Sequence, residues 1–217
     1  MRLAVLLSGS GSNLQALIDA WRAGALGVEI ALVLSDRADA YGLQRALQHQ
    51  IPAAFVPLPW PGGPARAGAA RAEARAAWER RLLAVLNAFD YDLVLLSGFM
   101  RVLSASFLDG CRAPVINQHP ALLPPSGGDI VTTSAGLVIP ALRGAHVVPD
   151  ALRLGLPVTG CTIHCVTPAV DDGPVLASAE VPILPGDDEA SLHERIKVEE
   201  RRLVVEVVNR LALGSCN

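Results

Sequence analysis

The sequence has 217 residues, which is enough for one sizeable domain with its own hydrophobic core. Its formal net charge is -3, so it lacks the broad basic field that holds nucleic acids or anionic membranes, and any anionic ligand must be bound locally. No apolar run approaches the roughly 20 residues that span a bilayer, and the first residues lack a basic segment followed by a long apolar one. We therefore expect a cytoplasmic protein.

Short apolar runs alternate with longer segments of helical periodicity over the first 120 residues. This alternation predicts an α/β, doubly wound fold with a mostly parallel sheet and helices on both faces. The runs expected to form strands are Leu3–Leu7, Ile30–Leu34, Ala53–Leu58, Leu93–Leu96 and Val115–Ile116. Helices are expected at residues 13–23, 41–49, 70–89 and 104–110, and a loop is expected at 59–68.

The remainder of the chain has a different pattern. Residues 125–142 are rich in Gly, Ser, Thr and Pro without a clear period, and we expect a long surface loop or lid there. Strands are expected at Thr162–Val166 and Val175–Ile183, followed by a long helix at Glu189–Leu213 that Gly214 ends. We predict that residues 1–217 form a single domain, in which these last elements pack on the sheet.

The four cysteines, Cys111, Cys161, Cys165 and Cys216, are too few and too unevenly spaced for a disulfide framework, so reduced thiols are expected. The segment between Cys161 and Cys165 includes His164, and these are residue types found in zinc sites. The segment has the pattern of a strand, however, on which the two cysteines share one face and the histidine points to the other. We therefore expect small buried residues here and no metal.

Ligands of an open parallel sheet bind beyond the C-terminal ends of its strands. The loops expected at that edge are Ser8–Asn13, Gly98–Leu103 and Asn117–Pro120. In the first of them, Gly11, Ser12 and Asn13 lead directly into a helix, where backbone N–H groups and the helix dipole favour a phosphate. A tight turn with a helix cap would use the same residue types, and the sequence supports both interpretations equally.

The segment INQHPALLP, residues 116–124, is more specific. If a strand ends here, the side chains of Asn117 and His119 point to the same side because they are two residues apart. Acyl transfer needs such a pair, namely a donor for the oxygen that becomes negative and a group of near-neutral pKa that moves protons. The alternative is a histidine that only ends a strand before a Pro-rich turn.

A carboxylate beside that imidazole could come from Asp171 or Asp172, and it would raise the pKa of the imidazole. Adjacent acids before Gly-Pro are also a common turn composition, so the alternative is an ordinary turn. On the last helix, Lys197 and Glu200 share one face, where a solvated ion pair is the alternative to a binding site.

Taken together, these motifs resemble those of the folate-dependent phosphoribosylglycinamide formyltransferases of purine synthesis. The resemblance covers nearly the whole chain and rests, in order, on AVLLSGSGSNLQALIDA, LVLLSGFMRVLS, INQHPALLP, GCTIHCVTPAVDDGPVLASAEVPI and LPGDDEASLHERIKVEE. The Asn-x-His-Pro-x-Leu-Leu-Pro block is shared by folate formyltransferases and hydrolases generally. The early Gly-Ser-Gly-Ser-Asn and the late Lys-Val-Glu-Glu narrow the resemblance to the glycinamide enzymes.

The resemblance implies that a formyl group passes from 10-formyltetrahydrofolate, as co-substrate, to the amine of 5'-phosphoribosylglycinamide without a metal. The alternatives are a formyltetrahydrofolate hydrolase and a non-catalytic module that binds a phosphosugar or a folate. It implies a phosphate-binding half at residues 1–110 and a catalytic, folate-binding half at residues 111–217. Asn117, His119 and Asp171 match the catalytic trio, and the first of the two aspartates is the matching one. The implied partners are small molecules, with no nucleic acid or membrane, and a homodimer is left open.

The binding residues implied by the resemblance form two groups. Those for phosphoribosylglycinamide are Gly11, Ser12, Asn13, Lys197, Val198, Glu199 and Glu200, with Glu200 facing the amino end. Those for the folate are Arg75, Met100, Arg101, Val102, Leu103, Asn117, Thr167, Pro168, Ala169, Val170 and Asp171, with Arg71 as the alternative to Arg75. The chain departs from the family by an insertion of roughly 16 residues before Gly144, the size of a compact surface loop, so the role of His146 is left open.

Overall fold

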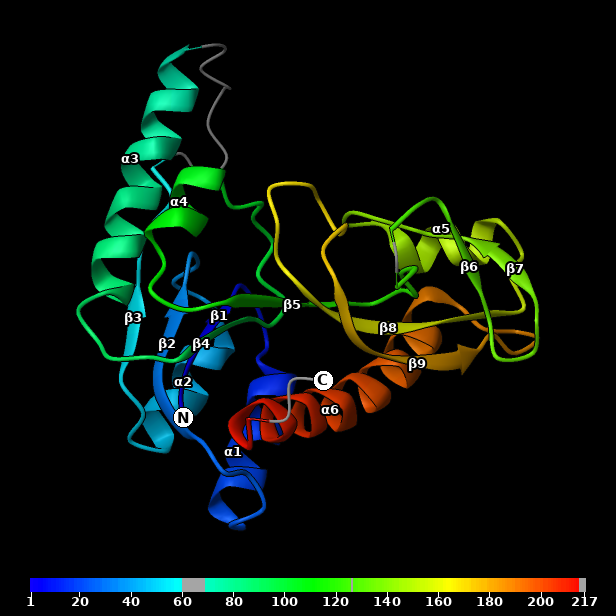
Figure 1. Ribbon diagram of the computed structural model, residues 1–217, viewed down its shortest axis with the longest axis horizontal. Coiled ribbons are helices and arrows are strands. Elements are labelled where there is room, and N and C mark those ends of the chain that lie inside the picture. The colour runs from blue at the N-terminus through cyan, green and yellow to red at the C-terminus, as the bar shows by residue number, and fades with distance from the viewer. Residues whose placement is uncertain (60–68, 126, 215–217) are drawn as a thin grey trace. The chain divides into compact units, whose positions relative to one another are not determined.

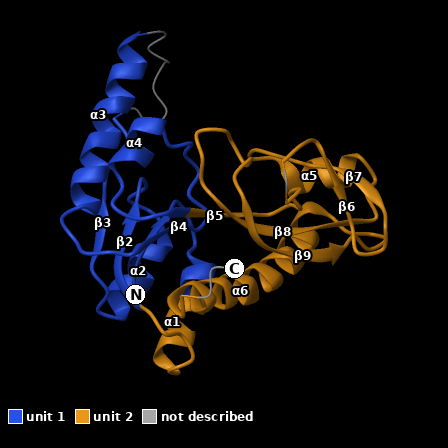
Figure 2. Ribbon diagram, viewed as in Figure 1, with its two compact units in different colours: residues 1–15, 29–115 blue, residues 16–28, 116–217 orange. Residues whose placement is uncertain are grey.

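The structure is a computed structural model that describes residues 1–59, 69–125 and 127–214. Most of the expected loop at 59–68, together with Cys216, lies outside the described residues. Two compact units are present: unit 1 comprises residues 1–15 and 29–115, and unit 2 comprises residues 16–28 and 116 onward (Figure 2). Residues 16–28 belong to the second unit. The expected division into a phosphate-binding half and a catalytic half at residue 110 stays a prediction.

Unit 1 contains four parallel strands in the order β3-β2-β1-β4. Their bounds are β1 Arg2–Leu7, β2 Glu29–Ser35, β3 Ala53–Phe55 and β4 Leu93–Leu96. Leu3 of β1 is aligned with Ile30 on one side and Leu93 on the other. The side chains of β1 and β4 are almost wholly buried, which explains why these strands are continuous apolar runs without alternation.

The helices near these strands are α1 Ser12–Arg22, α2 Tyr41–Gln48, α3 Ala69–Leu86 and α4 Ala105–Gly110 (Figure 1). Trp78 of α3 is fully buried, and its ring N–H donates to the carbonyl of Val56 at 3.1 Å, which fixes α3 to the end of β3. α4 begins at Ser104, whose hydroxyl accepts from the N–H of Phe107 at 3.2 Å.

Unit 2 contains the antiparallel strands β5 Val115–His119, β8 Val158–Cys165 and β9 Val175–Pro182, and the helices α5 Val147–Arg153 and α6 Glu189–Ala212. α6 runs along β8 and β9 (Figure 1) and buries Leu192, Ile196 and Val207. A capping box of Asp188 and Ser191 begins α6, and Gly214, at a φ of 71°, follows its end. No helix in the described part of the chain is both long and apolar enough to cross a membrane.

The seven strands follow the order β3-β2-β1-β4-β5-β8-β9 in one mixed sheet. The predicted α/β fold, with a mostly parallel sheet, later strands and a long C-terminal helix, is therefore confirmed. The main differences are at strand ends: β3 stops at Phe55, β5 continues to His119, and β8 already begins at Val158. The longer β5 carries Asn117 and His119 within a strand.

The segment 125–142 contains a hairpin, where the sequence predicted a loop. Its strands are β6 Ile130–Thr132 and β7 Val138–Pro140, which pair antiparallel with Val131 opposite Ile139. Both of these side chains are buried against Leu122. The strands have only three residues each and alternate with turn-forming residues, so their periodicity is too short to detect in the sequence.

Candidate active site

The end of β5 presents Asn117 and His119 on one face of the strand, as their spacing predicts. The following turn is held by Thr162 of β8, whose hydroxyl donates to the carbonyl of Ala121 at 2.8 Å and accepts from the N–H of Leu123 at 3.1 Å. His119 is consequently a well-fixed, buried side chain with 4% of its surface exposed.

Asp171 approaches these two side chains from the loop between β8 and β9. One carboxylate oxygen accepts from the amide of Asn117 at 3.4 Å, and the other lies 3.5 Å from Nδ1 of His119. Asp171 has a φ of 50°, a left-handed conformation that aspartate tolerates better than most residues. A Cβ at Gly173 would lie 1.9 Å from the carbonyl oxygen of Cys165, so only glycine lets this loop lie so close to β8. The carboxamide, imidazole and carboxylate thus form one cluster within unit 2.

Burial lowers the pKa of His119, and this effect outweighs the Asp171 carboxylate and the Leu142 carbonyl, which both raise it. The expectation that a neighbouring carboxylate raises the imidazole pKa is confirmed for the effect of Asp171, but desolvation is the larger effect and the net shift is downward. Burial by itself would raise the pKa of Asp171, but the hydrogen bond from His164, the charge of His119 and the N–H of Gly144 hold it below its usual value.

His164 also belongs to the cluster, whereas the sequence left open whether it lines the cleft or is a satisfied strand residue. It lies directly opposite Asn117 in the β5–β8 pairing. Its Nε2 is 3.2 Å from the Asn117 amide nitrogen and 3.5 Å from the Asp171 carboxylate, and its Nδ1 is 2.9 Å from the carbonyl oxygen of Cys165. With Nδ1 donating to the Cys165 carbonyl, Nε2 of a neutral ring accepts from Asn117, and the hydrogen bond from Nε2 to Asp171 forms only when the ring is protonated. The role of His164 follows from the register that aligns it in β8 with Asn117 in β5, and the sequence does not specify that register.

The other nitrogen of His119, Nε2, lies 2.8 Å from the carbonyl oxygen of Leu142, at the end of the 125–142 segment. Both ring nitrogens therefore face acceptors. A neutral imidazole can donate through only one of its nitrogens, whereas a protonated one satisfies both. After His119 gains a proton, Nε2–H can donate to the Leu142 carbonyl while Nδ1–H faces the Asp171 carboxylate.

In unit 1, Gly11, Ser12 and Asn13 lie at the start of α1, where the sequence predicted phosphate binding. Gly11 has a φ of 67°, and a Cβ on it would lie 2.7 Å from the Cα of Gly42. Close packing therefore already explains this glycine. The phosphate interpretation of the three residues stays a prediction.

The loop after β4 contains the four consecutive residues predicted to contact the folate ring. Met100 and Val102 are large exposed hydrophobic residues, whereas Leu103 is buried. Arg101 forms an ion pair of 2.6 Å with Asp36, a fully buried carboxylate that also accepts from Ser8 at 2.6 Å. The guanidinium of Arg101 is thus engaged within unit 1.

Arg75, the predicted folate-contacting arginine, reaches the same loop from α3. Its guanidinium donates to the carbonyl of Val102 and pairs with Glu79 at 3.3 Å. Glu79 in turn accepts from the backbone N–H and hydroxyl of Ser104. Arg75 therefore contacts one of the other predicted folate residues.

The predicted binding residues of α6 and of the β8–β9 loop lie in unit 2. Lys197 is 3.7 Å from Glu194, Glu199 pairs with Arg202 at 2.9 Å, Val198 is exposed, and Glu200 is buried. The carbonyl of Glu200 accepts from the Gln118 side chain at 3.1 Å, and Gln118 points to the face of β5 opposite Asn117 and His119. In the loop, the hydroxyl of Thr167 donates to the carbonyl of Ala169 at 3.2 Å, Pro168 is exposed, and Val170 is 46% exposed.

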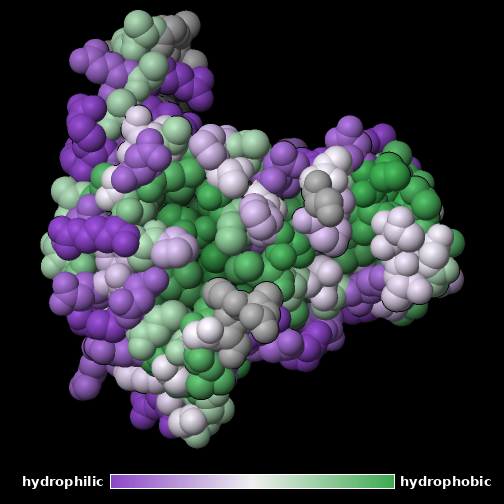
Figure 3. All heavy atoms as spheres, viewed as in Figure 1, coloured by the Kyte–Doolittle hydropathy of each residue, from purple (hydrophilic) through white to green (hydrophobic). Residues whose placement is uncertain are grey.

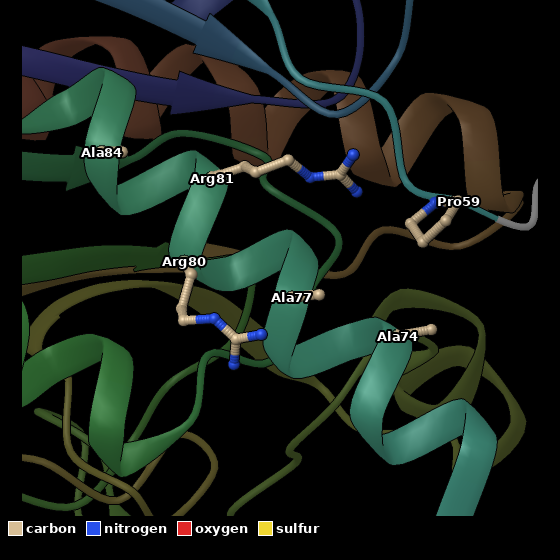
Figure 4. A pocket seen from close by; sticks show the side chains of 6 residues that line it. All are labelled: Pro59, Ala74, Ala77, Arg80, Arg81 and Ala84. Carbon is tan, nitrogen blue, oxygen red and sulfur yellow. The ribbon is translucent and has the colours of Figure 1, made fainter.

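A pocket of about 570 Å³ lies along α3, but none of the predicted site residues lines it (Figure 4). Its lining residues are Pro59, Ala74, Ala77, Arg80, Arg81 and Ala84. Within the described ranges, no group of three or more His, Cys, Asp or Glu side chains could hold a metal ion.

An amide donor, an imidazole and a carboxylate in one cluster are suited to acyl transfer, and comparison with known proteins specifies the acyl group. The family model described as formyl transferase matches residues 1–208, so the chain belongs to the formyl transferase family. This confirms the resemblance found in the sequence.

Within that family, the chain is similar to proteins of purine synthesis. Phosphoribosylglycinamide formyltransferase of Mycobacterium tuberculosis is 40% identical over 211 residues, covering 97% of this chain and 85% of that protein. The trifunctional purine biosynthetic protein adenosine-3 of Drosophila melanogaster is 40% identical over 220 residues, but this chain spans only 14% of its length. The crystal structure of glycinamide ribonucleotide transformylase 1 from Symbiobacterium toebii matches with a TM-score of 0.79 at 36% identity, covering 99% of this chain and 88% of that one.

Proposed function

We propose that this protein transfers the formyl group of 10-formyltetrahydrofolate to the amine of 5'-phosphoribosylglycinamide. The products are phosphoribosyl-N-formylglycinamide and tetrahydrofolate, in a step of purine synthesis. The names of the relatives support this choice of substrates, and family membership supports the formyl transfer. The observation that carries the proposal is that Asn117 and His119 share one strand face and one carboxylate, Asp171.

The proposed transfer is direct. The amine nitrogen attacks the formyl carbon, the bond from that carbon to the folate nitrogen breaks, and the proton lost by the amine passes to that folate nitrogen. The amide N–H of Asn117 and the protonated imidazole of His119 stabilise the oxygen that becomes negative, and the ring carries the proton between the two nitrogens. Asp171 favours the protonated ring.

The N–H of His119 that would reach the substrate oxygen is at Nε2, because Nδ1 faces Asp171. Nε2 currently faces the Leu142 carbonyl at 2.8 Å. We therefore expect the substrate oxygen to replace Leu142 as its partner.

The residues proposed to hold the two substrates are the two groups that the family resemblance implies, with Arg75 supported by its contact with the Val102 carbonyl.

The test is an assay with glycinamide ribotide and formyl-folate that follows the deformylated folate by absorbance. We expect turnover with the unmodified protein and a loss of about 10³-fold in His119→Ala, while both substrates still bind, because proton transfer contributes about 10²- to 10⁴-fold. His49→Ala, in α2's C-terminal region of unit 1, is the control and should retain turnover. Wild-type turnover in His119→Ala would refute the assignment.

A formyl-folate hydrolase is the second candidate, because it would use the same three residues with water in place of the amine. Formate release without added glycinamide ribotide would favour it, whereas strict dependence on the amine supports the transferase.

The predicted cytoplasmic location and the optional homodimer stay predictions, which cell fractionation and light scattering would measure.

A further inference from the structure

Arg143 connects the loop of Asp171 to the start of the 125–142 segment. Its Nε donates to the carbonyl of Asp171 at 3.1 Å, and one terminal nitrogen donates to the Asp172 carboxylate at 3.1 Å and to the carbonyl of Gly128 at 2.6 Å. The other terminal nitrogen lies 3.5 Å from the Asp129 carboxylate. The guanidinium is about one quarter exposed, so water screens these contacts only in part.

Asp171 needs such support because its backbone is in the left-handed region, with a φ of 50°. For a non-glycine residue this conformation is unfavourable and persists only when the surroundings enforce it. Arg143 binds the backbone carbonyl of Asp171, and the next residue, Gly144, donates its N–H to the carboxylate at 2.9 Å. Two consecutive residues thus hold the backbone and the side chain of Asp171.

The residue before Arg143 completes this arrangement. The carbonyl of Leu142 lies 2.8 Å from Nε2 of His119, while the carboxylate held by Gly144 lies 3.5 Å from Nδ1 of the same ring. The base of the hairpin is closed beside them by the N–H of Ala141, which donates to the carbonyl of Asp129 at 2.9 Å. Residues 142–144 therefore contact both members of the imidazole–carboxylate pair.

We propose that Arg143 is a positioning residue for the reaction: it holds the Asp171 carboxylate against His119 by tying its loop to the base of the inserted hairpin. The proposal rests on the formyl transfer proposed above, since Arg143 would act on that reaction through Asp171 and His119. The groups that face His119 are Asp171, His164 and Arg143, and a test must separate the charge of Arg143 from its geometry.

The first measurement is the steady-state kinetics of Arg143→Met and Arg143→Lys. Misplacement of a catalytic group by about 1 Å can cost about 10²-fold, so we expect kcat to fall by tenfold or more in Arg143→Met, with both KM values within about twofold. Arg143→Lys keeps the charge but lacks the planar fork of five N–H donors, spread over separate nitrogens, that reaches these acceptors, so we expect its kcat to fall about threefold or more. Arg153→Met, which removes an exposed arginine of α5 paired with Asp150, is the matched control and should retain kcat.

The second measurement is a double-mutant cycle read by NMR titration of the His119 imidazole, and it does not require activity. Asp171→Asn should lower the His119 pKa in the wild-type background, because the carboxylate raises it. If Arg143 holds Asp171 in place, this drop should shrink by half or more in the Arg143→Met background and stay unchanged in the Arg153→Met background.

An equal drop in the wild-type and Arg143→Met backgrounds would overturn the proposal, as would a kcat within twofold of wild type in Arg143→Met. If Arg143→Met does not fold, Arg143→Lys takes its place in both measurements, and a wild-type kcat with an undiminished drop is then the contradicting result. Absence of formyl transfer in the unmodified protein would refute the proposed function instead, while the titration would still report whether Arg143 positions Asp171.

Discussion

At the scale of single residues, the surroundings of His119 have opposite effects on the pKa of its imidazole. Burial favours the neutral ring, whereas Asp171 and the Leu142 carbonyl favour the protonated ring. The balance leaves a pKa below the ordinary value, so His119 is mostly neutral at pH 7. In the proposed transfer such a ring takes the proton of the attacking amine, stabilises the negative oxygen while it is protonated, and then releases the proton to the folate nitrogen.

Asp171→Asn tests this balance directly. Asparagine tolerates positive φ as aspartate does, so the loop should keep its conformation. Removal of the carboxylate removes an effect that raises the His119 pKa, and we expect that pKa to fall further below 6.5. NMR titration of the imidazole between about pH 4 and 8 would measure it. An unchanged or higher pKa would contradict the geometry described for Asp171.

The spacing of Asn117 and His119 was sufficient to predict that their side chains share a face, because alternation along a strand is a local property. The choice between Asp171 and Asp172 could not be made from spacing, and it came from the family resemblance. The participation of His164 could not be predicted, because it depends on the register that aligns residue 164 with residue 117.

At the scale of secondary-structure elements, the β6–β7 hairpin is the main addition to the expected fold. Val131 and Ile139 pack on Leu122, close to the turn that follows His119, and Ser134 at the hairpin turn donates to Glu180 of β9 through its hydroxyl at 2.8 Å. The opposite side of the hairpin exposes Ile130, Leu137 and Val138, and Figure 3 shows hydrophobic residues over this region. The hairpin is thus anchored by one small hydrophobic cluster and by the contact with Glu180 of β9.

Ile139→Ala should loosen this hairpin. Truncation of buried isoleucine costs about 2–5 kcal/mol, and we expect about 2 kcal/mol here because the cluster is small. Hydrogen exchange at the amides of Thr133 and Ala141, which donate within the hairpin, would report the lower opening free energy. Val138→Ala on the same strand is the control; Val138 is 63% exposed, so exchange should change by less than about 0.5 kcal/mol. Equal effects of the two substitutions would contradict the described packing.

At the scale of the whole molecule, several groups have pKa values that differ from those of an unfolded chain. Those of His119 and His193 are lowered, in both cases mainly by burial. Between pH 6.5 and these lowered values, the unfolded chain binds more protons than the folded one, so stability decreases as the pH falls. Asp171 also has a lowered pKa. Its contribution to the stability of the folded state is present above about pH 4 and is lost at lower pH.

We therefore expect the urea midpoint to fall between pH 7.5 and 5.5, before the carboxylates become protonated, and to fall again below about pH 4. Each histidine contributes a slope of at most about 1.4 kcal/mol per pH unit. His119→Asn should reduce the slope in the first interval, because one of the two titrations is removed. A midpoint that is constant or rises from pH 7.5 to 5.5 would contradict the lowered histidine pKa values.

The sequence by itself determined the approximate positions of the strands in the seven-stranded sheet, the long last helix and the location of Asn117 and His119 on one strand face. These follow from local periodicity and from motifs that lie within one segment, as in Leu93–Leu96, which forms β4 with unchanged bounds. Only the tertiary structure decided that His164, the Leu142 carbonyl and Arg143 surround the same imidazole and carboxylate. The contacts of Leu142 with His119, of Arg143 with Asp171 and of His164 with Asn117 join residues 23 to 47 positions apart. They depend on strand register and on a hairpin whose three-residue strands carry too few residues to show a period.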